Sequence, residues 1–94
     1  MYFEEDIIGI NLEDKTIFSK EIVKTNFEKC SLKRSKFDNS NFKDTVFYEC
    51  NLEKSDLSDC SGLEIDIMNN RTKGAKVSID LALNIVKKLG LKIV

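Results

Sequence analysis

The chain has 94 residues, of which 41% are hydrophobic and 33% are charged, and its formal net charge is −1. This length is enough for a single domain, residues 1–94, with a modest core, and the composition excludes a disordered charged tail. No apolar run approaches the roughly 20 residues that a membrane span needs. The near-zero charge provides no global field for capturing nucleic acid or anionic lipid, so neither is an expected partner.

The N-terminal sequence MYFEEDII is acidic. It lacks the basic region and apolar stretch of a signal peptide, so we expect a cytoplasmic protein. The cysteines number three, and an odd count without a secretion signal indicates reduced thiols rather than a disulfide framework. Residues 1–6 precede the repeating pattern and are expected to form the N-terminal edge of the fold.

From residue 7 onward, a large apolar residue returns every fifth position. A period of five suits neither the helix, with its period near 3.6, nor the strand, with its period of 2. The pattern weakens after residue 57 but returns at two later positions. The predicted central core positions are Ile7, Leu12, Ile17, Ile22, Phe27, Leu32, Phe37, Phe42, Phe47, Leu52, Leu57, Ile67 and Val77.

A second column of small residues stands two positions before each large one. Residues two apart on an extended segment point the same way, so each pentapeptide is predicted to be one short extended side followed by a turn. Lys15 and Lys20 occupy this inward position near the start, so the first coil is expected to be irregular or open to solvent. The predicted small core positions are Thr25, Cys30, Ser35, Ser40, Thr45, Cys50, Ser55 and Cys60.

A chain that turns after every five residues should coil, and the charges indicate four sides in each turn of the coil. At a spacing of twenty residues the outward charges alternate in sign, which favours stacking of neighbouring coils. The same register places Phe27 over Phe47 and Cys30 over Cys50. The alternating charges are Glu13, Lys33, Glu53 and Lys73.

The run TNFEKCSLKRSKFDNSNFKDTVFYECNLEKSDLSDC, residues 25–60, resembles the pentapeptide-repeat family. That family repeats a small residue, a polar residue, a central Leu or Phe, and two polar residues. The resemblance implies an all-β solenoid, a right-handed quadrilateral β-helix, with about 3.5 coils over residues 7–77. Ser, Thr and Cys here replace the Ala that is common at the small position of many members.

Residues 78–94 are expected to form a helix and a tail. Ser78 has the character of an N-cap, and Gly90 that of the residue that ends a helix. The apolar residues of the helix cover an arc of roughly 200°, about twice what one buried face requires. One side of the arc can cap the open end of the coil, and the other still needs cover. The alternating end LKIV predicts a short strand.

This C-terminal segment is similar to the ends of pentapeptide-repeat proteins that dimerise through a C-terminal helix and strand, including the quinolone-resistance group. The resemblance implies a homodimer through the C-terminal helix. The residues expected to share the cap and the dimer interface are Ile79, Leu81, Leu83, Ile85, Val86, Leu89, Leu91 and Ile93.

The sequence predicts no catalytic, cofactor-binding or metal-binding residues, and therefore no enzyme. There is no His, the commonest general base. The cysteines are spaced by twenty and ten, unlike a structural zinc site, although Cys30 and Cys50 could in principle approach disulfide distance. The stretch KRSKF could contact phosphate, but a mixed-charge surface is favoured. The repeat phenylalanines follow the inward frame, whereas Tyr48 points outward.

Three functions remain open. The first is a homodimeric protein-binding scaffold whose partner is unknown. The second, drawn from the resemblance, is a DNA mimic that binds a type II topoisomerase, DNA gyrase or topoisomerase IV. Near-neutral charge and short length disfavour it: the most acidic side, with Asp6, Glu28, Glu49 and Asp66 against Lys29, sums to only −3. The third is a structural fragment that binds a larger repeat protein through its N-terminal edge.

Overall fold

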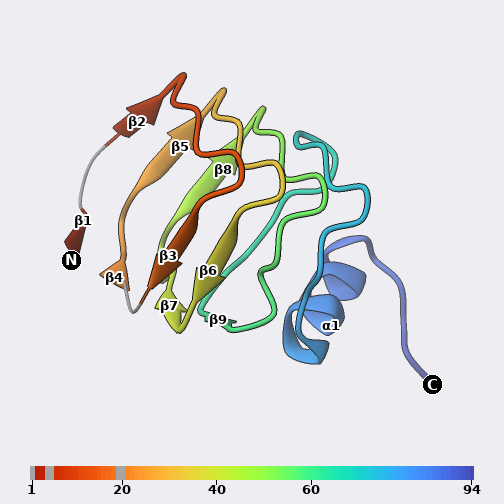
Figure 1. The fold of residues 1–94 in the computed structure, drawn as a ribbon. Coiled ribbons are helices and arrows are strands. Elements are labelled where there is room, and N and C mark those ends of the chain that lie inside the picture. The colour runs from red at the N-terminus through yellow and green to blue at the C-terminus, as the bar shows by residue number, and fades with distance from the viewer. Residues whose placement is uncertain (1, 4–5, 19–20) are drawn as a thin grey trace.

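The computed structural model of the protein describes residues 2–3, 6–18 and 21–94. Its shape is elongated, with extents of 39 × 21 × 21 Å. In chain order the elements are β1 (Tyr2–Phe3), β2 (Asp6–Ile8), β3 (Thr16–Phe18), β4 (Glu21–Ile22), β5 (Asn26–Glu28), β6 (Lys36–Asp38), β7 (Ser40–Asn41), β8 (Val46–Tyr48), β9 (Cys60–Ser61) and α1 (Ile79–Lys88). The strands stack side by side along the long direction, and α1 lies at one end of the stack (Figure 1).

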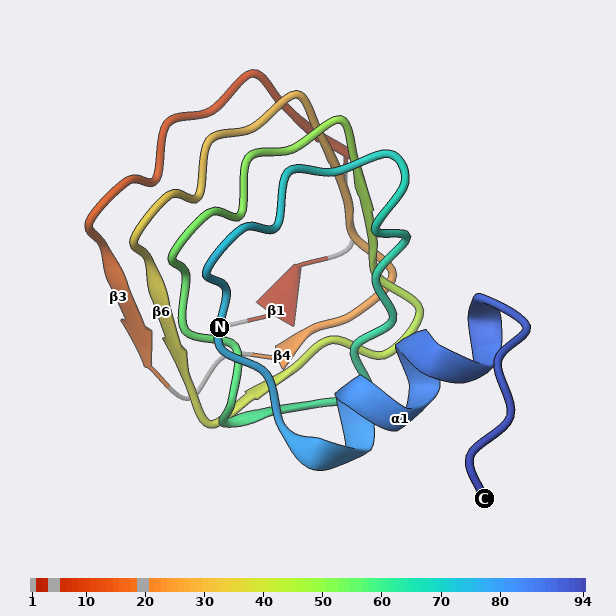
Figure 2. The same cartoon turned by 90° about the vertical axis from the view of Figure 1, so that its right-hand side faces the viewer.

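All strand pairs are parallel, and most join residues twenty positions apart. The sheets have the orders β1-β4-β7-β9, β2-β5-β8 and β3-β6. Isolated bridges extend the β3-β6 ladder to residue 76 and form a further ladder through Asn11, Ser31, Asn51 and Arg71. The described residues thus form four ladders, as the twenty-residue spacing predicts, and the turns of the chain nest around one axis (Figure 2). The architecture is a parallel β-solenoid followed by one helix.

The corners of the coil have a left-handed backbone that recurs every fifth residue between 24 and 54. Such a conformation costs a residue other than glycine roughly 1–2 kcal/mol. Here it is adopted by acids, bases and one amide alike, with φ between 51° and 61°. Stacking and core burial therefore outweigh local preference at each corner. The residues are Asp14, Lys24, Lys29, Arg34, Asn39, Asp44, Glu49 and Lys54.

The small inward residues do more than fill space, because most of them donate a hydrogen bond to a backbone carbonyl. Ser35 Oγ donates to Leu32 O at 2.6 Å, and Cys50 Sγ donates to Phe27 O at 3.3 Å. Thr45 Oγ1 likewise donates to the carbonyl of Ile22. Ser, Thr and Cys each combine small volume with a donor. These residue types therefore fit the interior and also satisfy a backbone carbonyl.

The central column forms the core. Phe27 stacks on Phe47 with ring centroids 4.9 Å apart and planes 12° apart, and Phe42 packs edge-on against Phe37 at 5.0 Å. The buried central residues are Ile22, Phe27, Leu32, Phe37, Phe42, Phe47, Leu52 and Leu57, and the buried small residues are Thr25, Cys30, Ser35, Ser40, Thr45, Cys50 and Ser55. Ile7, Leu12 and Ile17 are only partly buried, because no further coil covers them within the described residues.

The five-residue frame breaks after Leu57, and the predicted core changes there. Gly62 occupies the central position without a side chain, and the next residue, Leu63, is buried instead. Ile65 is buried at a position where the pattern calls for a small residue. Cys60 and Ile67 are partly buried, and both pack against the core. Val77 is exposed, so its assignment to the core was wrong: it lies in the last turn, just before α1.

Lys15 is exposed in the first coil, whereas Lys20 lies outside the described residues. The bridge between Asn11 and Ser31 and the pairing of β3 with β6 keep this coil in register with the next one. Of the two expected alternatives, irregular or open to solvent, the structure shows the second: the coil is regular where it is described, and its Lys15 is exposed.

Helix α1 begins and ends as the sequence predicts. The Ser78 side chain accepts from the backbone N–H of Leu81 at 3.1 Å, which confirms Ser78 as the N-cap. At the other end, Gly90 has φ +80°, its N–H donates to Lys87 O, and the N–H of Leu91 donates to Val86 O. This pair of bonds is a Schellman motif. No helix in the described part of the chain is long and apolar enough to cross a membrane.

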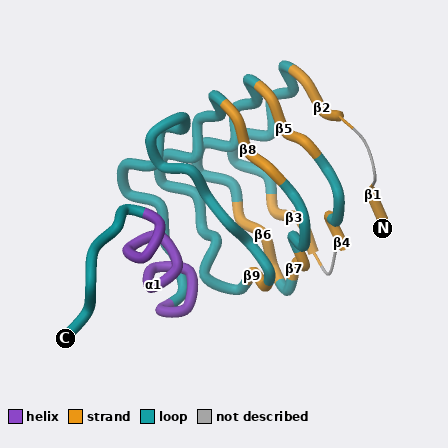
Figure 3. Tube along the Cα trace, turned by 180° about the vertical axis from the view of Figure 1, so that it is seen from behind, coloured by secondary structure: helices purple, strands orange, loops and turns teal. Residues whose placement is uncertain are grey.

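The predicted terminal strand is absent, because residues 91–94 adopt no regular structure. A strand needs a neighbouring edge with which to exchange backbone hydrogen bonds. The tail instead runs away from the sheets (Figure 3), and the N–H of Leu91 is already engaged by the helix end.

Candidate interaction surfaces

Outward carboxylates accept hydrogen bonds from groups in the turns of the coil. Asp56 accepts from both the N–H and the Oγ of Ser58, at 3.1 and 2.6 Å, and these hydrogen bonds lower the pKa of Asp56. Asp59 accepts from the backbone N–H of Asn39 at 2.8 Å. Among the described residues, no group of three or more His, Cys, Asp or Glu side chains could hold a metal ion.

All three cysteines are free thiols. Cys30 and Cys50 are buried one above the other and donate to the carbonyls of Ile7 and Phe27, both at 3.3 Å. Burial raises the pKa of Cys50, and burial together with Asp59 raises the pKa of Cys60 to about 12. The thiolate, which is the reactive form, is therefore scarce at Cys50 and Cys60.

We expect the thiols to be unreactive in the folded protein. Treatment of the native protein with a thiol-specific disulfide reagent at mildly alkaline pH should give almost no colour, because the reagent needs an accessible thiolate. The same protein in denaturant should react at all three cysteines. Fast reaction of even one equivalent in the native state would contradict the burial described here.

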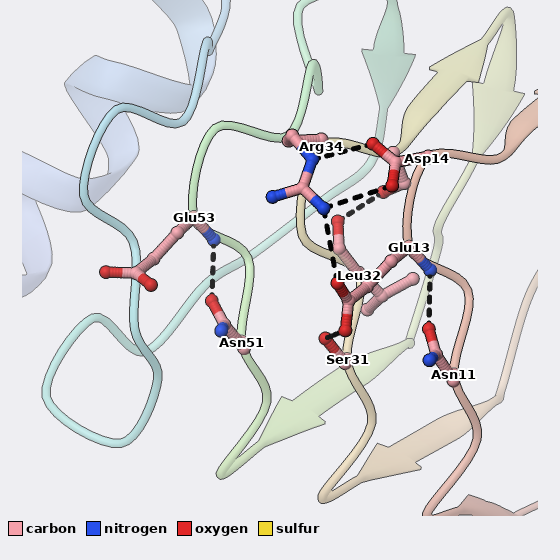
Figure 4. Close-up of polar contacts among 9 residues, drawn as sticks. Asn11, Glu13, Asp14, Ser31, Leu32, Arg34, Asn51 and Glu53 are labelled. Carbon is pink, nitrogen blue, oxygen red and sulfur yellow. Dashed lines mark hydrogen bonds and ion pairs between the residues drawn. The ribbon is translucent and has the colours of Figure 1, made fainter.

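The charges of neighbouring coils pair through arginine, in contrast to the predicted column of Glu13, Lys33, Glu53 and Lys73. Arg34 Nε donates to Asp14 Oδ1 at 2.6 Å, and Arg34 Nη2 lies 3.4 Å from Glu13 Oε1 (Figure 4). The hydrogen bond from Arg34 lowers the pKa of Asp14. Arg71 stands 3.9 Å from Glu53. The planar guanidinium reaches two carboxylates where a lysine reaches one.

This cluster also bears on the stretch KRSKF. Because Arg34 is engaged by two carboxylates of the preceding coil, the stretch presents a mixed-charge surface. Two Asx turns flank the cluster: Asn11 Oδ1 accepts from the N–H of Glu13, and Asn51 Oδ1 accepts from the N–H of Glu53 (Figure 4). The exposed pairs add little to stability.

The outer face of the sheet β2-β5-β8 combines apolar and acidic side chains. Ile8, Val46 and Tyr48 are between 42% and 59% exposed. Glu28 lies between Ile8 and Tyr48 in the register of the sheet. Glu49, next to Tyr48, raises the pKa of the Tyr48 hydroxyl. Sequence reasoning identified the acids and Tyr48 but missed Ile8 and Val46, because a single apolar residue beside the inward column carries no signal by itself.

Helix α1 has two apolar sides. Leu81 is buried and Ile85 packs partly against the core, so this side caps the last coil. On the opposite side Ile79 is 78% exposed and Leu83 is 40% exposed. Val86 is partly buried, and the remaining residues assigned to the cap and interface, Leu89, Leu91 and Ile93, are exposed.

Comparison with known proteins agrees with the geometry. The family model for pentapeptide repeats matches residues 25–61, with eight copies of the repeat. No curated protein matches the chain significantly. The matched segment contains the regular corners, the buried central column and the donor-bearing small column described above. Residues 25–61 are therefore a run of pentapeptide repeats.

Proposed function

We propose that this protein is a non-enzymatic, homodimeric scaffold that binds another protein. Proteins of this family are generally non-enzymatic interaction scaffolds. The family and the twenty-residue stacking support a right-handed, four-sided coil of about 3.5 turns as the rigid part of the scaffold. The partner is a protein surface. The flat sides of the coil present outward residues that can contact it.

The observation that carries the proposal is the outward apolar stripe on α1. Ile79, Leu83 and Val86 follow the spacing i, i+4, i+7, which places them on one side of a helix. Leu81 and Ile85 already use the opposite side to cap the coil. A stripe of this kind on a water-exposed helix is stabilised when a second copy covers it, and a twofold dimer uses the same patch on both subunits.

The dimer is tested by sedimentation velocity at micromolar concentration. The wild type should sediment as a dimer, and the double variant Ile79→Gln, Leu83→Gln as a monomer, because glutamine keeps the helix and removes the apolar stripe. Lys88→Gln, an exposed change on the side of the same helix opposite to the stripe, should leave the dimer intact. A wild type that sediments as a monomer would refute the dimer.

A DNA-mimicking role toward DNA gyrase or topoisomerase IV is the second candidate, and one observation favours it. Asp6, Glu28, Glu49 and Asp66 lie on or beside one face, with Lys29 among them and Lys88 near Asp66. Duplex DNA carries one charge per about 1.7 Å of axis, which is far denser than these acids. Inhibition or protection of gyrase supercoiling by micromolar protein would favour the mimic over the scaffold.

A further inference from the structure

The outer face of β2-β5-β8 has an order that the coil itself does not require. The register stacks Ile8, Glu28 and Tyr48 in one outward column, and Asp6, Asn26 and Val46 in the other. The inward residues between these columns are Ile7, Phe27 and Phe47, which supply the core contacts. Because side chains alternate across a strand, the outward residues contribute nothing to that core.

Exposed large apolar residues concentrate on this face. Within the described residues between 6 and 76, they are Ile8, Ile10, Val46, Tyr48 and Met68. Three of them, Ile8, Val46 and Tyr48, lie in the strands of the face. Ile10 lies past the corner at Gly9, in the inward register of Cys30, and is not part of the face. Met68 lies in a turn of the next coil, where it lines a cavity together with Ile85 and Leu89 of α1. A patch of this kind on a soluble rod marks a binding surface.

The charges of the patch select the kind of partner. Glu28 lies at its centre, with Asp6, Glu49 and Asp66 around it. The nearby cations are Lys29, which follows Glu28, and Lys88, which lies near Asp66. Phosphate groups of nucleic acids and anionic lipids would be repelled by these acids. A partner that fits must instead bring apolar side chains together with Lys or Arg.

The spacing of the face selects the shape of the partner. Successive residues within each column are about 4.8 Å apart along the stack. From Ile8 to the coil that contains Met68, the face spans roughly 14 Å. An α-helix has a pitch of about 5.4 Å, so nearly three turns lie along this length with their side chains close to the column spacing. An apolar stripe on such a helix would meet Ile8, Val46 and Tyr48 while flanking cations approach Glu28.

We propose that the β2-β5-β8 face binds a basic amphipathic helix of a partner protein, lying along the stack. The inference rests on the proposed scaffold function and names the face and the chemistry of its partner. It does not require the dimer, because the three strands of the face lie on the coil of each subunit (Figure 1).

The probe is a fluorescent synthetic helix of about 14 leucine and lysine residues with all leucines on one side, titrated by anisotropy. The wild type should bind it with one site per subunit. Tyr48→Ser and Glu28→Lys should each weaken binding about tenfold or more, because central aromatic and charged contacts dominate interfaces of this kind. Circular dichroism verifies that both variants fold.

Asp38→Lys is the matched control for Glu28→Lys. Each acid follows an inward phenylalanine and is the last, outward-facing residue of a three-residue strand, and each is partly buried. Asp38 stands on β6, in a different sheet, so its reversal should leave the affinity unchanged. Equal weakening by both reversals would show only a general charge effect and would overturn the proposal.

Two further arms decide the remaining outcomes. A peptide of the same composition without an apolar side should bind at least tenfold more weakly, and equal binding would overturn the proposal. Self-association of the wild type that Tyr48→Ser abolishes would make a second copy the occupant and would also overturn it. The variant Ile79→Gln, Leu83→Gln should still bind the helix, so that loss of the dimer and loss of this site are distinguishable.

Discussion

Replacing Phe42 with aspartate is expected to unfold the protein. The Phe42 side chain is fully buried and packs against Phe37 at 5.0 Å and Phe47 at 5.8 Å between ring centroids. Loss of the ring alone costs about 3–5 kcal/mol, and an unpaired buried carboxylate adds several more. A domain of this size has a total stability of only about 5–15 kcal/mol. The variant should show no cooperative urea transition by circular dichroism.

Lys43→Asp is the control, because it places the same carboxylate one residue later on an exposed side chain. Its free energy of unfolding should stay within about 0.5 kcal/mol of the wild type. If Phe42→Asp kept a cooperative transition close to that of the wild type, the inward column would not be the core of the fold.

The second large effect is expected at Asn70, whose side chain takes the place of a strand. Its Oδ1 accepts from the N–H of Cys50 at 2.9 Å, and its Nδ2 donates to Phe47 O at 2.9 Å and to Asp66 O at 2.7 Å. Asn70→Ala leaves these backbone groups without their partner, at roughly 1–3 kcal/mol for each group that stays buried. We expect a loss of about 3 kcal/mol in the free energy of unfolding, measured in urea.

Asn11→Ala makes the same substitution where the amide has a lighter role. Asn11 Oδ1 accepts one local bond, from Glu13 N at 2.9 Å, at an exposed position near the open end of the coil. That variant should lose no more than about 1 kcal/mol. Similar losses for the two variants would mean that Asn70 does not close the coil against its neighbour.

The repeat made most of the coil predictable from sequence. The central and small columns are set by a period of five, and a side chain at these positions either fits the interior or does not, so composition alone carries the signal. The same holds for α1, because Ser78 and Gly90 act on their own backbone neighbours. Local rules of this kind need no knowledge of the rest of the chain.

The missed features depend on contacts between coils. The Asn70 side chain replaces a ladder partner by accepting from the N–H of Cys50 in the preceding coil. Ile65 is buried where the five-residue pattern calls for a small residue. Arg34 rather than Lys33 pairs with the preceding coil because of how far and how broadly a guanidinium reaches. The terminal strand failed for the opposite reason: its alternation is present, but no edge stands beside it.

For the candidate surfaces, sequence reasoning predicted the two-sided helix and the acidic side with Tyr48 pointing outward. It could not identify the apolar patch, because Ile8 is forty residues from Tyr48 in the chain. Only the register of β2, β5 and β8 places Ile8 on the same face as Val46 and Tyr48, two strands away.

At the left-handed corners, the type of side chain can change without a change in the backbone conformation. Lys29, Arg34, Asp44 and Glu49 all adopt the same backbone conformation, with φ between 51° and 58°. Since the coil accepts either sign of charge at these sites, mutations there can change which ligand its surface binds while the buried core stays the same. Selection for binding a new ligand would therefore cost little stability at the corners, and protein engineering can use the same positions.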